Sequence, residues 1–246
     1  MKRFGIVSLL CIFVIKNVFT QSTFPYQFSI HKETTLLSVG IGFTAYGWHI
    51  GKKVNGLTVN QLNLLNVEDI HPRTDRSAAR RWSPAAAKWS DRLLVVAALP
   101  PVMLTGSKAG DSWRQGGGVA LMGLEALMLS AGLTNTVKNL VLRPRPYAYQ
   151  SNVPLAVRLE ADTRRSFFSG HTSTVAVASY FTAQVYADLY PDSRWKPWVW
   201  TGAATLPLAV GIQRYRAGKH FPTDILVGYA VGALCGVLTP YWHRKR

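Results

Sequence analysis

The sequence is poor in acidic residues and in cysteine. It contains 12 Asp and Glu residues against 28 Lys and Arg, which gives a net charge of +16, and its two cysteines are Cys11 and Cys235. Two cysteines so placed exclude a disulfide framework, a cysteine-based zinc site and a cysteine nucleophile. The excess of positive charge predicts an anionic partner, which composition alone leaves open among phosphate groups, an acidic lipid surface and nucleic acid.

Long uninterrupted apolar runs are also scarce, although the chain is lipophilic overall. Hydrophobic residues make up 48% and charged residues 16% of the 246 residues, and the mean hydropathy is +0.07. Residues 1–21 begin with Lys2 and Arg3 and continue with a short apolar run. This pattern predicts a signal peptide, or alternatively an uncleaved N-terminal membrane anchor. Since no break in composition follows, we expect a single domain over residues 22–246.

Apolar segments recur along the rest of the chain at lengths typical of helices rather than strands. They cover residues 35–50, 93–105, 117–137, 172–189, 198–212 and 224–239. We therefore expect an all-α bundle of about six core helices, with Pro222 in the first turn of the last one. Many small residues in these segments would let helices approach closely in a membrane, although they would also suit a tightly packed soluble bundle.

The C-terminal stretch "YWHRKR" is typical of an interfacial anchor with a cytoplasmic end. If all six segments cross the membrane, counting back from this tail places the turns at 138–171 and 213–224 together on the outer face. We therefore expect a membrane-embedded bundle in a bacterial envelope, at the inner membrane, with a site at helix ends facing the periplasm. The alternative is a soluble periplasmic bundle.

Three short stretches at the ends of expected helices carry candidate chemistry. The first, "KNLVLRPRP", contains Lys138 and Arg145, which alone would be ordinary partners of a helix C-terminus. In the second, Ser169 and Gly170 begin a helix, where backbone N–H groups and a hydroxyl favour an anion. His171 adds a group that exchanges protons near neutral pH. An ordinary helix cap beside an incidental histidine is the simpler reading of this second stretch.

The third stretch, "QRYRAGKHFPTD", places Arg214 and His220 on either side of a glycine-containing loop, with Asp224 four residues after the histidine. A carboxylate at that position can bind one imidazole nitrogen and leave the other free to act as a base or nucleophile. The simpler alternative is a dipole-stabilising aspartate beside an exposed histidine.

Taken together, the order and spacing of the three stretches resemble the signature of the type 2 phosphatidic acid phosphatase (PAP2) superfamily. That superfamily also includes bacterial class A acid phosphatases and vanadium haloperoxidases, and the resemblance runs over residues 117–246. Two positions depart from the family pattern: Phe168 stands where the family has proline, and Gln213 where it has serine. Neither change removes a residue with a chemical role, although Gln213 could alter rate or substrate preference.

The resemblance implies a metal-independent phosphatase without a cofactor, acting through a phosphohistidine. It implies that His220 is the nucleophile, that Asp224 orients it and that His171 is the general acid and base. The phosphate-binding residues it implies are Lys138, Arg145, Ser169, Gly170 and Arg214.

The expected substrate is an anionic lipid phosphate monoester or diphosphate, such as phosphatidate, phosphatidylglycerol phosphate, a polyprenyl diphosphate or a lipid A. Alternatives are a soluble exported acid phosphatase, a vanadate-dependent haloperoxidase and a non-enzymatic binder of anionic lipid. We expect no nucleic-acid partner, and the sequence leaves the oligomeric state open.

Two further expectations concern residues outside the three stretches. His31, His49, His71 and His243 show no metal-ligand spacing, and we expect them at the surface or the membrane interface. The segment 75–91 is expected to form a surface helix with Trp82 and Trp89 on one face, or alternatively a lid over a lipid substrate.

Overall fold

The computed structural model describes residues 24–106 and 113–245, and within them the chain folds into a bundle of six long α-helices. The expected leader at residues 1–21 lies outside these described residues. The long helices are α2 (Ile30–Gly51), α4 (Pro84–Thr105), α5 (Trp113–Val141), α7 (Gly170–Leu189), α8 (Lys196–Arg216) and α9 (Pro222–His243). Each contains one of the six apolar segments, so the prediction of an all-α bundle is confirmed.

Local sequence explains where several helices begin. Ser29, Ser83 and Ser169 each accept a hydrogen bond from the backbone N–H group three residues further on, which caps α2, α4 and α7. Pro222 is the first residue of α9, as its fixed φ favours. Each of the three serine caps precedes an apolar segment, so the helix begins before the segment that predicted it.

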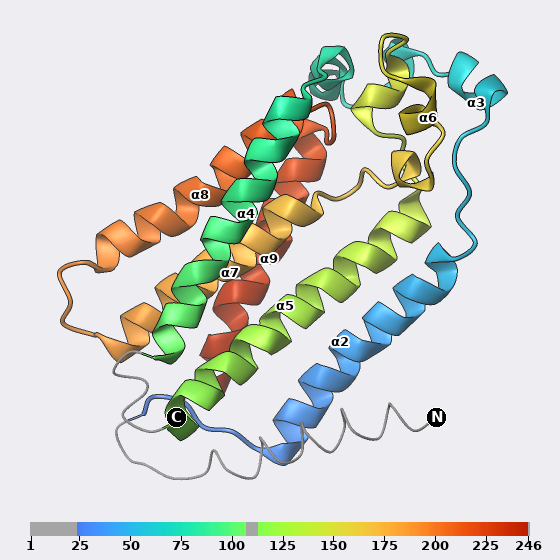
Figure 1. Cartoon of the computed structure of the whole chain (residues 1–246). Helices are drawn as coiled ribbons and strands as arrows, with labels where there is room; N and C mark the ends of the chain where they lie inside the picture. Colours follow the sequence, from blue (N-terminus) through green and yellow to red (C-terminus); the bar gives the residue numbers. More distant parts are fainter. Residues whose placement is uncertain (1–23, 107–112, 246) are drawn as a thin grey trace.

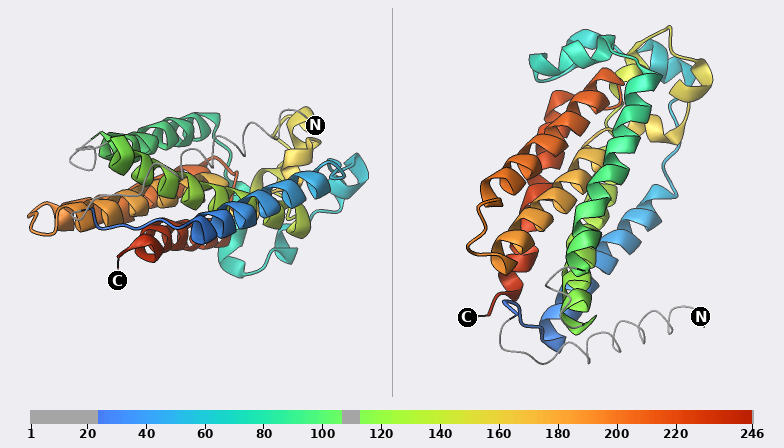
Figure 2. Two further views of the ribbon diagram at one scale, coloured as in Figure 1. Left: turned by 90° about the horizontal axis from the view of Figure 1, so that it is seen from below. Right: turned by 60° about the vertical axis from the view of Figure 1, so that its left-hand side comes forward.

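The long helices alternate in direction, so the bundle has two distinct ends (Figure 1). The connections 52–83 and 142–169 and the turn 217–221 lie together at one end, which we call the site end. The other end, the terminal end, holds both ends of the described chain, and an isolated β-bridge joins Tyr26 to Arg244 there. Both views in Figure 2 show the same arrangement.

Short helices cover the site end. They are α3 (Val59–Asn63), η1 (Val67–Asp69), η2 (Arg73–Arg80), η4 (Pro146–Tyr149), α6 (Leu155–Arg158) and η5 (Ala161–Arg164). Ile70, Ala78, Ala79 and Phe221 form a small buried cluster that attaches this cover to the start of α9. The connections that carry the candidate residues are therefore held by packing.

Helix α9 packs on α7 through three glycines spaced four residues apart. A Cβ atom added to Gly228, Gly232 or Gly236 would lie 2.5, 2.2 or 2.7 Å from a backbone carbonyl oxygen of the 169–177 stretch. Backbones at this separation leave no room for a side chain. The small residues thus serve close helix packing of the kind found in membrane proteins.

Large apolar side chains face outward from the bundle. Val95, Leu99, Val102 and Met103 on α4 are exposed, with exposed fractions between 57% and 73%. The helices around Trp113–Tyr149 and Pro222–His243 are long and apolar enough to cross a membrane. Exposed apolar surface of this extent is typical of contact with lipid, and the protein is a membrane-embedded bundle.

The prediction of one continuous helix over residues 75–91 is wrong. The structure has η2 up to Arg80, a short extended stretch, and then α4, which starts at Pro84. Trp82 precedes the helix and contacts Tyr147, with ring centroids 5.5 Å apart, whereas Trp89 is exposed on α4. Pro84 and the Ser83 cap start a new helix there, and this breaks the seven-residue spacing on which the prediction depended.

Candidate active site

The structure brings the eight predicted site residues together at the site end. Lys138 lies near the end of α5, and Arg145 lies in the connection that follows. Ser169, Gly170 and His171 lie at the start of α7. Arg214 ends α8, His220 lies in the turn, and Asp224 lies in the first turn of α9. Helix ends from four elements thus supply one site.

Three cationic side chains converge on His220. The Arg145 Nη1 atom lies 3.3 Å from His220 Nε2, and Arg145 and Arg214 are 4% and 6% exposed. Burial, together with the positive charges of Lys138, Arg145 and Arg214, holds the pKa of His220 well below its usual value of 6.5. The imidazole is therefore neutral at physiological pH.

The tautomer of His220 follows from its neighbours. A guanidinium nitrogen can only donate a hydrogen bond, so His220 Nε2 accepts one from Arg145. The proton of the neutral imidazole is therefore on Nδ1. Nδ1 lies 3.6 Å from the Asp224 Oδ2 atom, longer than a hydrogen bond, and has no hydrogen-bond partner among the described residues. This tautomer keeps the Nε2 lone pair on the side of the cations.

The carboxylate of Asp224 is fixed by groups that the sequence motifs did not reveal. Oδ2 accepts hydrogen bonds from the Ser166 hydroxyl at 2.5 Å and the Phe221 N–H at 2.9 Å, and Arg143 pairs with Oδ1 at 2.5 Å. Arg143 also pairs with the buried Asp75 at 2.8 Å. Arg143 therefore holds the carboxylate beside the histidine in place.

Arg145 is anchored by acceptors in addition to its contact with His220. Its Nε donates to the Asp162 carbonyl at 2.9 Å, its Nη2 to the Asp162 carboxylate at 2.8 Å, and its Nη1 to the Lys219 carbonyl at 3.0 Å. Burial alone would raise the pKa of Asp162, but the adjacent Arg145 outweighs this effect and holds it below the usual range. Asp162 thus orients Arg145, as a partner in the connection 142–169.

Helix α4 contributes to the site from a region without a recognisable motif. The Ser90 hydroxyl accepts a hydrogen bond from Arg214 at 3.2 Å. Asp91 lies 2.9 Å from His171 Nε2 and 3.8 Å from Arg214. Burial, followed by the charge of Arg214, lowers the pKa of His171 to about 4 despite Asp91. In this structure His171 is therefore a neutral donor to Asp91.

Ser169 and Lys138 make local contacts in the site. The Ser169 hydroxyl caps α7 and lies 2.9 Å from the Thr172 hydroxyl, so the cap interpretation of this residue holds here. Lys138 Nζ donates to the Arg165 carbonyl at 2.6 Å. A Cβ atom built on Gly170 would lie 3.8 Å from Lys138 Cε, which brings the lysine beside the start of the helix. The contact of Ser169 with Thr172 and the contact of Lys138 with Arg165 thus both lie within the cationic site.

Phe168 and Gln213, the two departures from the family pattern, lie beside the site. Phe168 is 2% exposed, its ring lies against Phe167, and the peptide bond between the two residues is cis. Gln213 is half-buried next to Arg214. The departing residues therefore leave the positions of the neighbouring Ser169 and Arg214 intact.

Fold and site together define a membrane protein with a cationic, histidine-containing anion site at one end of a helical bundle. Residues 120–246 match the family model of the PAP2 superfamily, so the chain belongs to that superfamily. The fold is also similar to a crystal structure described as the first transmembrane PAP2 type phosphatidylglycerolphosphate phosphatase from Bacillus subtilis. That match has 22% identity and a TM-score of 0.52 and covers 85% of this chain and 96% of the other. The membership and the fold mark the chain as a phosphatase.

Proposed function

We propose that the protein hydrolyses a lipid phosphate at the site end through a phosphohistidine intermediate. The observation that carries this proposal is the pairing of a neutral, fully buried His220 with Arg145, Arg214 and Lys138. Burial lowers the pKa of Lys138 to about 7, and a bound phosphoryl group would keep it protonated. A phosphoryl group supplies the negative charge that these cations lack, and the nucleophile beside it needs no deprotonation. Membership of the PAP2 superfamily supports the same assignment.

The geometry is suited to two displacement steps at phosphorus. In the first, His171 has taken up a proton together with the anionic substrate, whose charge raises its pKa. His220 Nε2 forms a bond to phosphorus while the bond to the leaving oxygen breaks, and the His171 imidazolium delivers its proton to that oxygen. In the second, His171 takes a proton from a water molecule whose oxygen attacks phosphorus, and the P–N bond breaks. Both steps conserve atoms and charge, since the proton that His171 loses returns from water.

The cations perform the electrostatic part of the reaction. Arg145 and Arg214 offer planar guanidinium groups for bidentate contact with phosphoryl oxygens, and Lys138 offers a compact charge. As negative charge spreads over the equatorial oxygens in the transition state, these donors are already in place. Ser169 and the Gly170 N–H would complete the set from the start of α7. Binding would require Ser169 to exchange its present cap contact for a phosphoryl oxygen.

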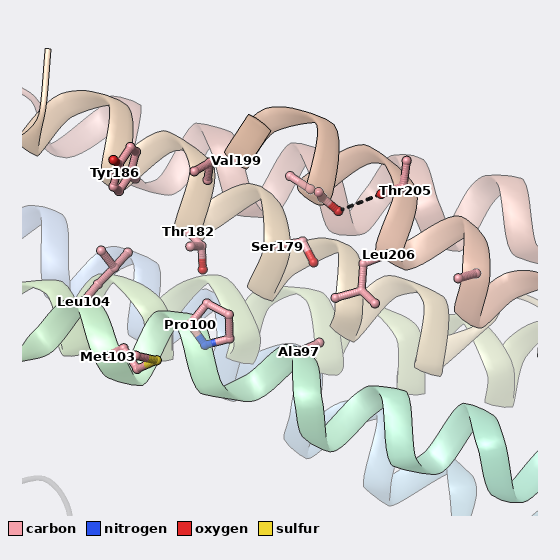
Figure 3. A pocket seen from close by; sticks show the side chains of 13 residues that line it. Ala97, Pro100, Met103, Leu104, Ser179, Thr182, Tyr186, Val199, Thr205 and Leu206 are labelled. Atoms are coloured by element: carbon pink, nitrogen blue, oxygen red, sulfur yellow. Dashed lines mark hydrogen bonds between the residues drawn. The ribbon is translucent and has the colours of Figure 1, made fainter. Parts of the chain in front are cut away.

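A lateral cavity supports a lipid as the carrier of the phosphate. Figure 3 shows a cavity of about 680 Å³ between α4, α7 and α8, lined almost entirely by apolar side chains including Ala97, Pro100 and Leu206. Ala97 follows Asp91 by six residues, or about 9 Å along α4. An apolar chain attached to a phosphate in the cage could extend along this direction into the cavity. A phosphatidylglycerol phosphate, the substrate class named for the Bacillus protein, is one such lipid.

We further propose that the site faces the periplasm. The basic C-terminal tail lies at the terminal end, opposite the site, and basic residues after a last apolar helix favour the cytoplasm. The site end also carries many basic residues, but the phosphate site itself requires several of them. A fluorescent protein fused after Arg246 should fluoresce, and an alkaline phosphatase fusion there should be inactive. The reverse result would place the site in the cytoplasm.

The catalytic proposal is tested with purified protein in detergent micelles on a panel of lipid phosphates and one soluble monoester. His220→Ala and His171→Ala should abolish phosphate release, whereas His49→Ala, which changes an exposed histidine of α2, should not. Equal activity in all three variants would defeat the assignment. Release by osmotic shock without detergent would instead favour a soluble phosphatase, and bromide oxidation with vanadate would favour a haloperoxidase.

A further inference from the structure

Three ionisable side chains meet in the interior at the terminal end of the bundle, far from the proposed phosphatase site. They are Glu33 in the first turn of α2, Glu125 in α5 and His243 at the end of α9, and each is 0% exposed. The expectation that His243 lies at the surface or interface is therefore wrong. Nothing in the sequence near His243 signals this, because its partners lie 210 and 118 residues away.

The orientation of His243 is fixed by a backbone carbonyl. Its Nδ1 lies 2.7 Å from the Thr239 carbonyl oxygen, which can only accept, so Nδ1 carries a proton. Nε2 therefore faces the two carboxyl groups, at 2.9 Å from Glu33 Oε2 and 3.4 Å from Glu125 Oε2. In the neutral imidazole Nε2 carries a lone pair. This nitrogen and the two carboxyl oxygens are therefore three electron-rich atoms that point at one another.

The carboxyl group of Glu125 lacks a donor. Neither of its oxygens receives a hydrogen bond from any described residue, although both are buried. Glu33, in contrast, accepts a hydrogen bond from the Ser29 N–H at 3.1 Å. A buried carboxylate without partners is costly, so positive charge is needed between the three groups. Either protons or a metal ion can supply it.

The positions of the three atoms suit a metal ion. Ligand atoms bound tetrahedrally at about 2.0–2.1 Å from Zn²⁺ lie about 3.3 Å apart, close to the 2.9 and 3.4 Å found here. All three ligating atoms lie within 4.8 Å of one another. A histidine that binds a metal through one nitrogen ordinarily donates its other N–H to a carbonyl or carboxylate, as His243 does to Thr239.

We propose that Glu33, Glu125 and His243 bind one divalent transition-metal ion, which joins α2, α5 and α9 at the terminal end. Two carboxylates balance the charge of the ion, and an imidazole with two carboxylates is a donor set that Zn²⁺ and Mn²⁺ accept. A cavity of about 250 Å³, lined in part by Thr35, Trp242 and His243, lies next to this cluster. Asp224 and His243 are 19 residues apart on α9, or about 28 Å, so the ion takes no part in catalysis.

The competing occupant is a pair of protons, one shared by the two carboxyl groups and one on His243 Nε2. To distinguish the two, full-length protein in mild detergent is stripped with a chelator, incubated with Zn²⁺ or Mn²⁺ alone, desalted and analysed for metal. We expect about one equivalent per chain with at least one of the two ions. We also expect a rise in Tm of about 5–15 °C that the chelator reverses.

Matched variants locate the ion. Glu125→Gln and His243→Gln should each lose the bound metal and the chelator-sensitive part of Tm, whereas His49→Gln should keep both. Lipid phosphatase activity of the stripped wild type should match that of the loaded protein at temperatures where both are folded, so this test is independent of the proposed function.

Two results would overturn the proposal. One is a wild-type protein that retains less than about 0.1 equivalent of either ion with an unchanged Tm, which would leave the proton pair as the occupant. The other is full metal content in both glutamine variants, which would place the ion elsewhere. If a variant fails to fold, the chelator experiment on the wild type decides alone.

Discussion

The two ends of the bundle differ in which of their buried ionisable groups lack a buried partner of opposite charge. At the site end, Arg145 and Arg214 are buried beside a neutral histidine, and the carboxylates that pair with them, Asp162 and Asp91, have side chains 51% and 60% exposed. At the terminal end, Glu33, Glu125 and His243 are closed off from solvent. The site end is thus suited to reversible binding of an anion. The terminal end is suited to a positive charge that remains bound.

At the site end, one arginine positions other side chains, whereas two arginines would bind the phosphate. Arg143 is balanced by Asp75 and Asp224, which are both fully buried. Its charge is therefore balanced by buried carboxylates, whereas the carboxylate partners of Arg145 and Arg214 are more than half exposed. Buried ion pairs of the first kind fix geometry more than they add net stability. Whether a cationic side chain positions other groups or binds the phosphate is therefore decided by its partners rather than by its distance from the site.

The largest expected effect distinguishes the histidines of the two ends. His220→Ala should lower kcat by about 10⁴-fold or more, because it removes the atom that would form the covalent intermediate. His243→Gln should leave kcat within about threefold when measured below its own Tm, since it lies about 28 Å away along α9. Steady-state phosphate release from a lipid phosphate in micelles measures both. A loss of similar size in His243→Gln would break the separation of the two ends.

A second prediction compares two arginines of the last turn of α8. Arg214→Ala should lower kcat by about 10²–10³-fold, the effect typical of removing one donor to a developing charge. Arg216→Ala, two residues further on with an exposed side chain, should change kcat by less than about threefold. Equal losses in the two variants would mean that the net charge of the site end, and not the aimed donor, governs the rate.

A third prediction concerns pH. The pKa of His220 is held well below 6.5, so the folded protein binds fewer protons there than the unfolded chain does as pH falls through 6.5. The free energy of unfolding should therefore fall with falling pH below 6.5, by about 1.4 kcal/mol per pH unit from this group. This contribution to stability is present above pH 6.5 and lost below it.

Denaturant titration of the wild type and His220→Ala between pH 5 and 8 measures how the free energy of unfolding changes with pH. The change below pH 6.5 should be smaller in the variant. The activity should respond differently from stability, because the free imidazole stays neutral. After correction for ionisation of the substrate phosphate, kcat/KM should not fall tenfold per unit directly below pH 6.5. A fall of that size would show an ordinary histidine at this position.

The smallest expected effect belongs to Asp91. Asp91→Asn should lower kcat by about tenfold or less, because the carboxylate orients His171 but is largely exposed and screened by solvent. It should also lower the pKa of His171 further, since Asp91 raises it. Asp192→Asn, an exposed aspartate in the connection between α7 and α8, is the matched control. A loss above about 100-fold would give Asp91 a larger part in proton transfer than its exposure allows.

The helices and the candidate site could be predicted from sequence because their signals are local. Apolar segments of helical length located all six long helices, and the spacing of Lys138, Arg145, Arg214, His220 and Asp224 connected three stretches that separately indicated little. The partners of these residues could not be predicted in the same way. Ser90 and Asp91 lie in a stretch without a motif, and Asp162 resembles any loop aspartate. Arg143 and its two carboxylate partners lie far apart in sequence, and no local pattern connects them.

The sequence by itself determined the helical bundle and, through its resemblance to a known family, the candidate residues for a phosphoryl group. These depend on apolar segments of helical length and on the order and spacing of short motifs, which a chain carries without folding. Only the tertiary structure decided which charges are balanced and which are not, because that depends on burial and on partners more than a hundred residues apart. The proposed metal site is the clearest case: its three ligands become a site only where α2, α5 and α9 close around them.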